Sequence, residues 1–136
     1  MSASAVKDLI RAMEEDGFGQ AGRDLHDYMD AKQKSPTHRV LVRQRTSSPE
    51  PDPVISVDSA LLTLTVMGAG SGILAQERAR DLAFRIYRRY ALDLSRDIGG
   101  NRYLSIIADQ PPYEQPASDT VDYVLGIRMT RYYGDM

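Results

Sequence analysis

The stretch that decides the fold runs from residue 62 to residue 90 and reads LTLTVMGAGSGILAQERARDLAFRIYRRY. It begins with alternating apolar and polar residues, which predict a strand, and then turns through glycines at 68, 70 and 72. The segment from Ile73 to Leu92 carries apolar residues at helical spacing, so we predict a helix there. Its predicted buried stripe consists of Ala75, Ala79, Leu82, Ala83, Ile86 and Tyr90. A strand, a glycine-rich turn and a helix in this order suggest a nucleotide site.

The glycine turn lacks the residues that nucleotide chemistry needs. A dinucleotide-binding turn has the pattern G-x-G-x-x-G, followed about 20 residues later by an acid that ends the next strand. Gly68 and Gly70 fit this pattern, but Ile73 stands at the third glycine position. We expect the chain from Leu92 to Arg96 still to be finishing its helix, and no Lys-Ser or Lys-Thr pair completes a phosphate loop. We interpret the turn as a flexible connection and keep a small nucleotide-binding protein only as an alternative.

Composition sets limits on the class of protein. The chain has 136 residues, which suits a single domain over 1–136, and a net charge of −2, which argues against broad phosphate binding. It has no cysteine, so thiolate metal sites and disulfides are excluded. The sequence has no apolar run long enough for a signal peptide or a membrane span, so we expect a soluble protein without a membrane partner.

The remaining elements complete an α+β pattern. Apolar spacing predicts a first helix over Ser4–Glu15, which Gly17 ends. Strands are predicted over 38–45, 103–108 and 121–133, and in the second of these Leu104 and Ile106 are expected to point inward. The apolar runs 54–57 and 61–67 could form a hairpin or a single bulged strand. The proline-rich stretches 46–53 and 111–116 are predicted to be exposed loops. We therefore predict a small, mainly antiparallel sheet of four to five strands, with two helices packed on one face.

Candidate functional residues point to an interface. The second predicted helix carries arginines along one side, and tyrosines end the last strand; both residue types are enriched at protein interfaces. The candidate interface residues are Arg78, Arg85, Arg88, Arg89, Tyr132 and Tyr133. A solvated or protein-binding face is favoured over nucleic-acid binding, because the helix also carries Glu77 and Asp81 and the chain lacks a wider positive charge.

Catalytic and metal motifs are missing from the sequence. His26 and His38 have no metal-ligand spacing, and no serine stands in a G-x-S-x-G elbow. We therefore predict no catalytic residues, no metal and no cofactor, and a protein that is not an enzyme.

Three blocks of the sequence together resemble a known family. The first is Gly17-Phe18-Gly19 with Gly22, Asp24 and Leu25. The second runs from Leu62-Thr63-Leu64-Thr65-Val66 through the glycine turn to Ala79-Arg80-Asp81-Leu82. The third joins Pro111-Pro112-Tyr113, Asp122-Tyr123 and Thr130-Arg131-Tyr132. In this order the blocks resemble the phage minor capsid or tail terminator family of long-tailed bacteriophages, over almost the whole chain.

The resemblance implies a structural virion protein without catalytic residues. It would form a hexameric ring at the head-proximal end of the tail tube, stop tube polymerisation and join the tail to the head connector. The implied partners are further copies of the chain, the tail tube protein and the connector or stopper protein, while DNA passes through the lumen without specific binding. The implied location is the tail or neck of the virion, after assembly in the host bacterial cytoplasm. Another neck component, such as a head completion or connector protein, is the alternative in the same setting, and a monomeric interaction module is the alternative outside it.

Overall fold

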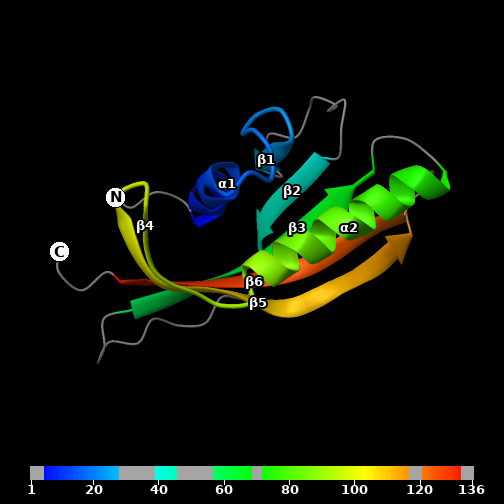
Figure 1. The fold of residues 1–136 in the computed structure, drawn as a ribbon. Coiled ribbons are helices and arrows are strands. Elements are labelled where there is room, and N and C mark those ends of the chain that lie inside the picture. The colour runs from blue at the N-terminus through cyan, green and yellow to red at the C-terminus, as the bar shows by residue number, and fades with distance from the viewer. Residues whose placement is uncertain (1–4, 28–38, 46–56, 69–71, 117–120, 133–136) are drawn as a thin grey trace.

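The computed structural model describes residues 5–27, 39–45, 57–68, 72–116 and 121–132 (Figure 1). This part of the chain contains two helices, each followed by three strands, which confirms the α+β class. Their order is α1 (Ala5–Glu15), β1 (Leu25–Asp27), β2 (Arg39–Gln44), β3 (Val57–Met67), α2 (Ile73–Arg89), β4 (Asp93–Ile98), β5 (Asn101–Pro116) and β6 (Val121–Tyr132).

The strands form one mixed sheet of six, in the order β1-β2-β3-β6-β5-β4. All neighbouring strands are antiparallel except β1 and β2, which are parallel. The predicted four to five strands were therefore too few, and the two edge strands β1 and β4 were missed. β1 has only three residues, too few to show an alternating pattern. β4 is an edge strand and needs little apolar burial, so its sequence, DLSRDI, can carry charged residues. It therefore lacks the apolar alternation that would predict a strand.

The helix α2 ends at Arg89, so the prediction that it continues beyond Leu92 was wrong. The carbonyl of Tyr90 accepts a hydrogen bond of 2.6 Å from the backbone N–H of Ala108 on β5. Because this carbonyl binds a strand, it does not accept a hydrogen bond from a further turn of helix, and β4 begins three residues later. By contrast α1 ends as predicted, where Gly17 takes a φ of 85° that glycine adopts without strain.

The strand β5 extends through the proline-rich stretch that was predicted to be a loop. Pro111 and Pro112 lie where the pairing with β6 shifts register between Gln110 and Tyr113, so they occupy a bulge. Among the described residues, β4 pairs with β5 only as far as Ile106, which leaves the later part of β5 as an outer edge. Proline is tolerated there because a missing N–H on an outer edge breaks no ladder hydrogen bond.

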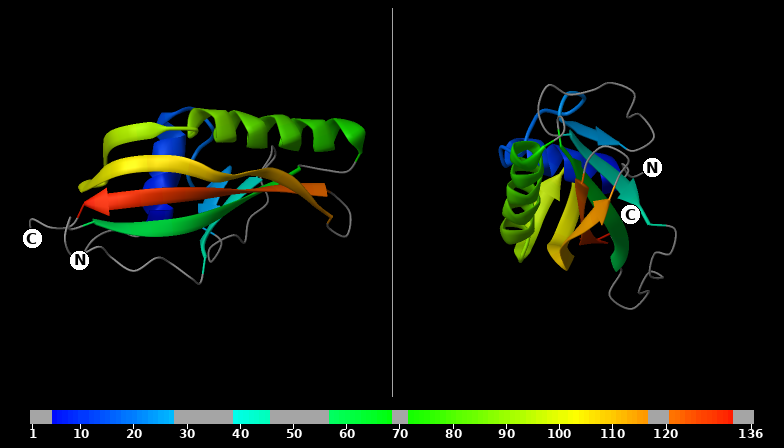
Figure 2. Two further views of the ribbon diagram at one scale, coloured as in Figure 1. Left: turned by 90° about the horizontal axis from the view of Figure 1, so that it is seen from below. Right: turned by 90° about the vertical axis from the view of Figure 1, so that its right-hand side faces the viewer.

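Both helices lie on the same face of the sheet, as predicted, and the core fills the space between them and the strands (Figure 2). From α2 the buried residues are Ala79, Leu82, Ala83 and Ile86, and Tyr90 directly after the helix is buried too, which confirms most of the predicted stripe. Ala75, also predicted to be buried, is only partly buried. The facing strand residues include Leu62, Leu64, Val66, Leu125, Ile127 and Met129. Each fully buried Leu or Ile side chain contributes about 1.5–3 kcal/mol, so this face supplies much of the stability.

One inward position was assigned incorrectly. Leu104 was expected to point inward with Ile106, but Leu104 is 37% exposed, and Tyr103 is buried in its place. The register of β5 against β6 shifts between Tyr103 and Ser105, which changes the alternation by one residue at this point.

Candidate interface surfaces and the polar networks behind them

The outer face of α2 presents three of the predicted interface residues to solvent. Arg78, Arg85 and Arg88 are all exposed, and we call these three residues the basic face. Arg78 and Arg85 are seven residues apart, so they lie on one side of the helix, and Arg88 follows one turn later. Nearby, the guanidinium of Arg80 lies 5.6 Å from the centre of the Phe84 ring, an arrangement that favours a cation–π contact. This surface combines arginine with aromatic area.

Arg89 differs from the other predicted arginines because it is engaged within the chain. Its Nη2 lies 3.3 Å from Asp16 Oδ1, and its Nη1 lies 3.4 Å from Asp93 Oδ2. Its guanidinium also lies 5.2 Å from the centre of the Tyr90 ring. The side chain of Tyr132 and the whole of Tyr133 lie outside the described residues, so their interface role stays a prediction.

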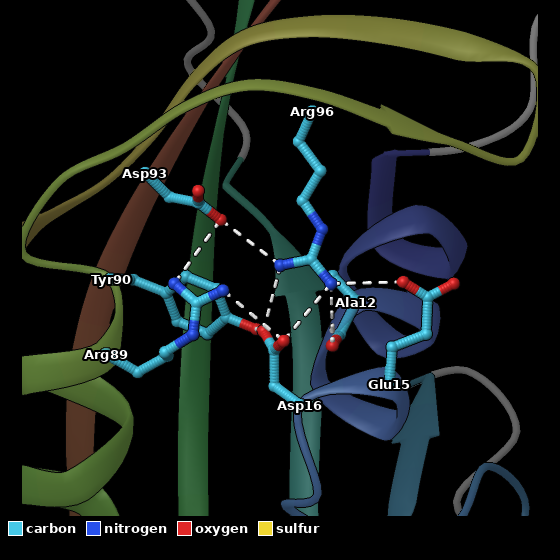
Figure 3. A network of polar contacts seen from close by, with 7 residues as sticks. All are labelled: Ala12, Glu15, Asp16, Arg89, Tyr90, Asp93 and Arg96. Atoms are coloured by element: carbon cyan, nitrogen blue, oxygen red, sulfur yellow. Dashed lines mark hydrogen bonds and ion pairs between the residues drawn. The ribbon is translucent and has the colours of Figure 1, made fainter.

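Arg89 belongs to a larger network centred on Asp16, which Figure 3 shows. Arg96 donates to both carboxylate oxygens of Asp16, over 2.9 Å and 3.2 Å, and the hydroxyl of Tyr90 donates over 2.6 Å. Arg96 also contacts Glu15 at 3.0 Å and Asp93 at 3.1 Å. The network therefore joins the end of α1, the end of α2 and the start of β4.

The electrostatics of this network suit an ionic contact that stabilises the fold. Burial raises the pKa of the Asp16 carboxyl, but the hydrogen bonds from Arg96 and Tyr90, together with the nearby arginine charges, outweigh burial and hold the pKa below its ordinary value. Burial and the hydrogen bond to Asp16 raise the pKa of the Tyr90 hydroxyl far above its usual range. The hydrogen bond to Asp16 also raises the pKa of Arg96. At neutral pH Asp16 is therefore negative, Arg96 is positive and Tyr90 is neutral, as the ion pair and its hydrogen bond require.

A second polar contact ties the middle of α1 to the β4–β5 turn. Asp8 is 1% exposed, and it accepts hydrogen bonds from the Tyr103 hydroxyl at 2.5 Å and from Asn101 Nδ2 at 2.8 Å. Burial, followed by the contact with Asp8, raises the pKa of Tyr103. At Gly99, where φ is 58°, a Cβ atom would lie only 2.7 Å from Asp8 Oδ1. Glycine is therefore needed for the turn to approach the carboxylate.

Both acids were missed as site residues, although each carries a sequence signal. Asp8 stands between Ala5 and Ala12, which share its side of the helix, and all three are buried. Asp16 follows the C-terminal end of α1, where the helix dipole disfavours an anion. An acid at such a place indicates a cationic partner elsewhere in the chain, but the signal does not identify Arg96.

The other face of the sheet carries no helix in the part of the chain that the structure describes (Figure 2). We call it the open face. It contains a hollow with a cavity volume of about 530 Å³ that β2, β3, β5 and β6 line together. The lining residues are Leu41, Arg43, Thr63, Thr65, Met67, Tyr113, Gln115, Pro116, Asp122 and Val124. The lining thus combines aliphatic, hydroxyl and aromatic groups with one acid and one base.

Arg45 spans the open face beside the hollow. Its Nη2 lies 3.0 Å from Asp109 Oδ1 and donates to the Leu62 carbonyl over 3.0 Å, while its Nε donates to Thr63 Oγ1 over 3.3 Å. The guanidinium passes directly over Gly126 of β6, where a Cβ atom would collide with it. Gly126 therefore allows an arginine to lie flat across the strand.

Metal and nucleotide sites find no support among the described residues. No group of three or more His, Cys, Asp or Glu side chains there is placed to hold a metal ion. His26 is buried with Nε2 2.8 Å from the Arg23 carbonyl, and His38 lies outside the described residues. The strand β3 that leads into the glycine turn lies between two antiparallel neighbours, whereas a dinucleotide-binding unit needs parallel strands. No helix in the described ranges is both long and apolar enough to cross a membrane.

Comparison with known proteins adds no family to these observations. No protein-family model and no curated protein matches the chain. The functional assignment therefore depends on the surfaces described above and on the resemblance in the sequence.

Proposed function

We propose that this chain is a structural virion protein of the tail terminator type, without catalytic activity. It would form a ring at the head-proximal end of a phage tail tube, stop tube polymerisation and join the tail to the head connector. The observation that supports this best is the pair of unlike surfaces on opposite sides of the molecule: the basic face of α2 and the open face of the sheet. A closed ring of identical subunits needs two such different patches, because each copy gives one surface and receives the other.

The edges of the sheet favour assembly through these surfaces. The edge strand β1 is three residues long, and the edge strand β4 carries Ser95 at a φ of 54°, which distorts the row of backbone groups. The outer part of β5 carries prolines. Short, distorted and proline-containing edges all oppose the addition of a further strand. Copies of the chain would therefore meet through faces rather than by continuing the sheet.

The charge distribution suits a ring through which DNA passes. The basic face lies on a chain whose net charge is −2, so the rest of the molecule is more acidic than the whole. On this proposal the basic face meets an acidic surface of a neighbour, which keeps its arginines away from the lumen. An acidic lumen repels phosphate and lets DNA move without specific binding.

The proposal is tested by the mass of the assembly. Native mass spectrometry of the purified chain should show a species of six times 15.2 kDa, and negative-stain images should show closed rings. The rings, added to the tail tube protein of the same phage, should shorten the tubes that it forms. A chain that stays monomeric at every concentration would contradict the proposal. A ring that leaves tube length unchanged would favour another neck component instead.

A further inference from the structure

We draw no further inference here: the strongest candidate, the exposed apolar surface patch of Ile73 and Leu74 in the first turn of α2, carries nothing because no contact in the part of the chain that the structure describes shows what covers it.

Discussion

Arg96 Nη1 lies 2.9 Å from Asp16 Oδ2, and Arg96 Nη2 lies 3.2 Å from Asp16 Oδ1, so one guanidinium binds both oxygens of one carboxylate. The two residues are 80 positions apart in the sequence, and both side chains are largely buried. Two-point binding of this kind is stronger and more directional than a single ion pair. The contact closes the corner where α1, α2 and β4 meet.

Replacement of Asp16 by asparagine should therefore destabilise the fold. Asp16→Asn keeps the size of the side chain but removes the charge that Arg96, Arg89 and Tyr90 face, and we expect a loss of about 2–4 kcal/mol in the free energy of unfolding. Urea unfolding followed by circular dichroism measures this loss. The control is Glu15→Gln, which removes the other acid on Arg96; its side chain is 55% exposed, so its cost should stay below about 1 kcal/mol. Equal costs for the two variants would contradict a special role for Asp16.

The same contact should appear in the acid stability of the protein. The folded-state pKa of Asp16 lies below the ordinary 3.8, so its stabilisation is fully present above that pH and is lost as pH falls through the lowered pKa. The gap in unfolding free energy between the natural chain and Asp16→Asn should stay constant from neutral pH to about pH 5 and narrow below pH 4. Urea titrations at a series of pH values measure the gap. A gap that stays constant throughout the acid range would show that Asp16 has no lowered pKa.

Gly126 should not accept a methyl group. A Cβ atom there would collide with the Arg45 guanidinium and would lie 2.7 Å from Asp109 Oδ1 and 2.9 Å from Gln110 Cβ. We expect Gly126→Ala to lower the unfolding free energy by about 1–3 kcal/mol. Arg45→Ala removes one of the colliding groups, so the double variant should lose less than the sum of the two single losses. Additive losses in this double-mutant cycle would show that Arg45 does not lie over Gly126 in solution.

The sequence predicted the elements that have a strong period and missed those that depend on distant partners. The α2 stripe from Ala79 to Ile86 depends on local spacing, so it was found, and β6 lies within its predicted range of 121–133. The end of α2 was misplaced because the Tyr90 carbonyl binds β5, which no local pattern shows. The strand beyond Gln110 was missed because its prolines are tolerated only where the sheet has an outer edge.

The candidate site was likewise predicted only where local spacing decides the outcome. Arg78, Arg85 and Arg88 were placed correctly on an exposed face, because helical spacing alone decides which residues share a side. Arg89 was grouped with them, but it contacts Asp93, four residues later in the chain, and Asp16, which follows α1. The hollow lies between four strands, and their order depends on pairing between distant segments, so no local pattern predicts it.

Charge reversal on the basic face should weaken assembly without unfolding the chain. Arg85→Glu with Arg88→Glu places two acids where the proposal puts contact with an acidic neighbour, and both positions are exposed, so the melting temperature should stay unchanged. We expect the concentration for half-maximal ring formation to rise at least about tenfold, equivalent to 1.4 kcal/mol, in native mass spectrometry. Added salt should weaken assembly of the natural chain more than that of the variant. In the natural chain salt screens the attraction between the arginines and the neighbour, whereas in the variant it screens the repulsion that the new acids cause.

The matched control for this variant is Arg11→Glu with Arg102→Glu, which changes the net charge equally at two exposed arginines away from α2. The two variants have the same net charge and therefore the same long-range repulsion between copies. Only the α2 variant changes residues of the proposed contact, so only this variant should lose the ring. Equal weakening in the two variants would assign the effect to net charge. Unchanged ring formation after reversal at Arg85 and Arg88 would remove the basic face from the interface.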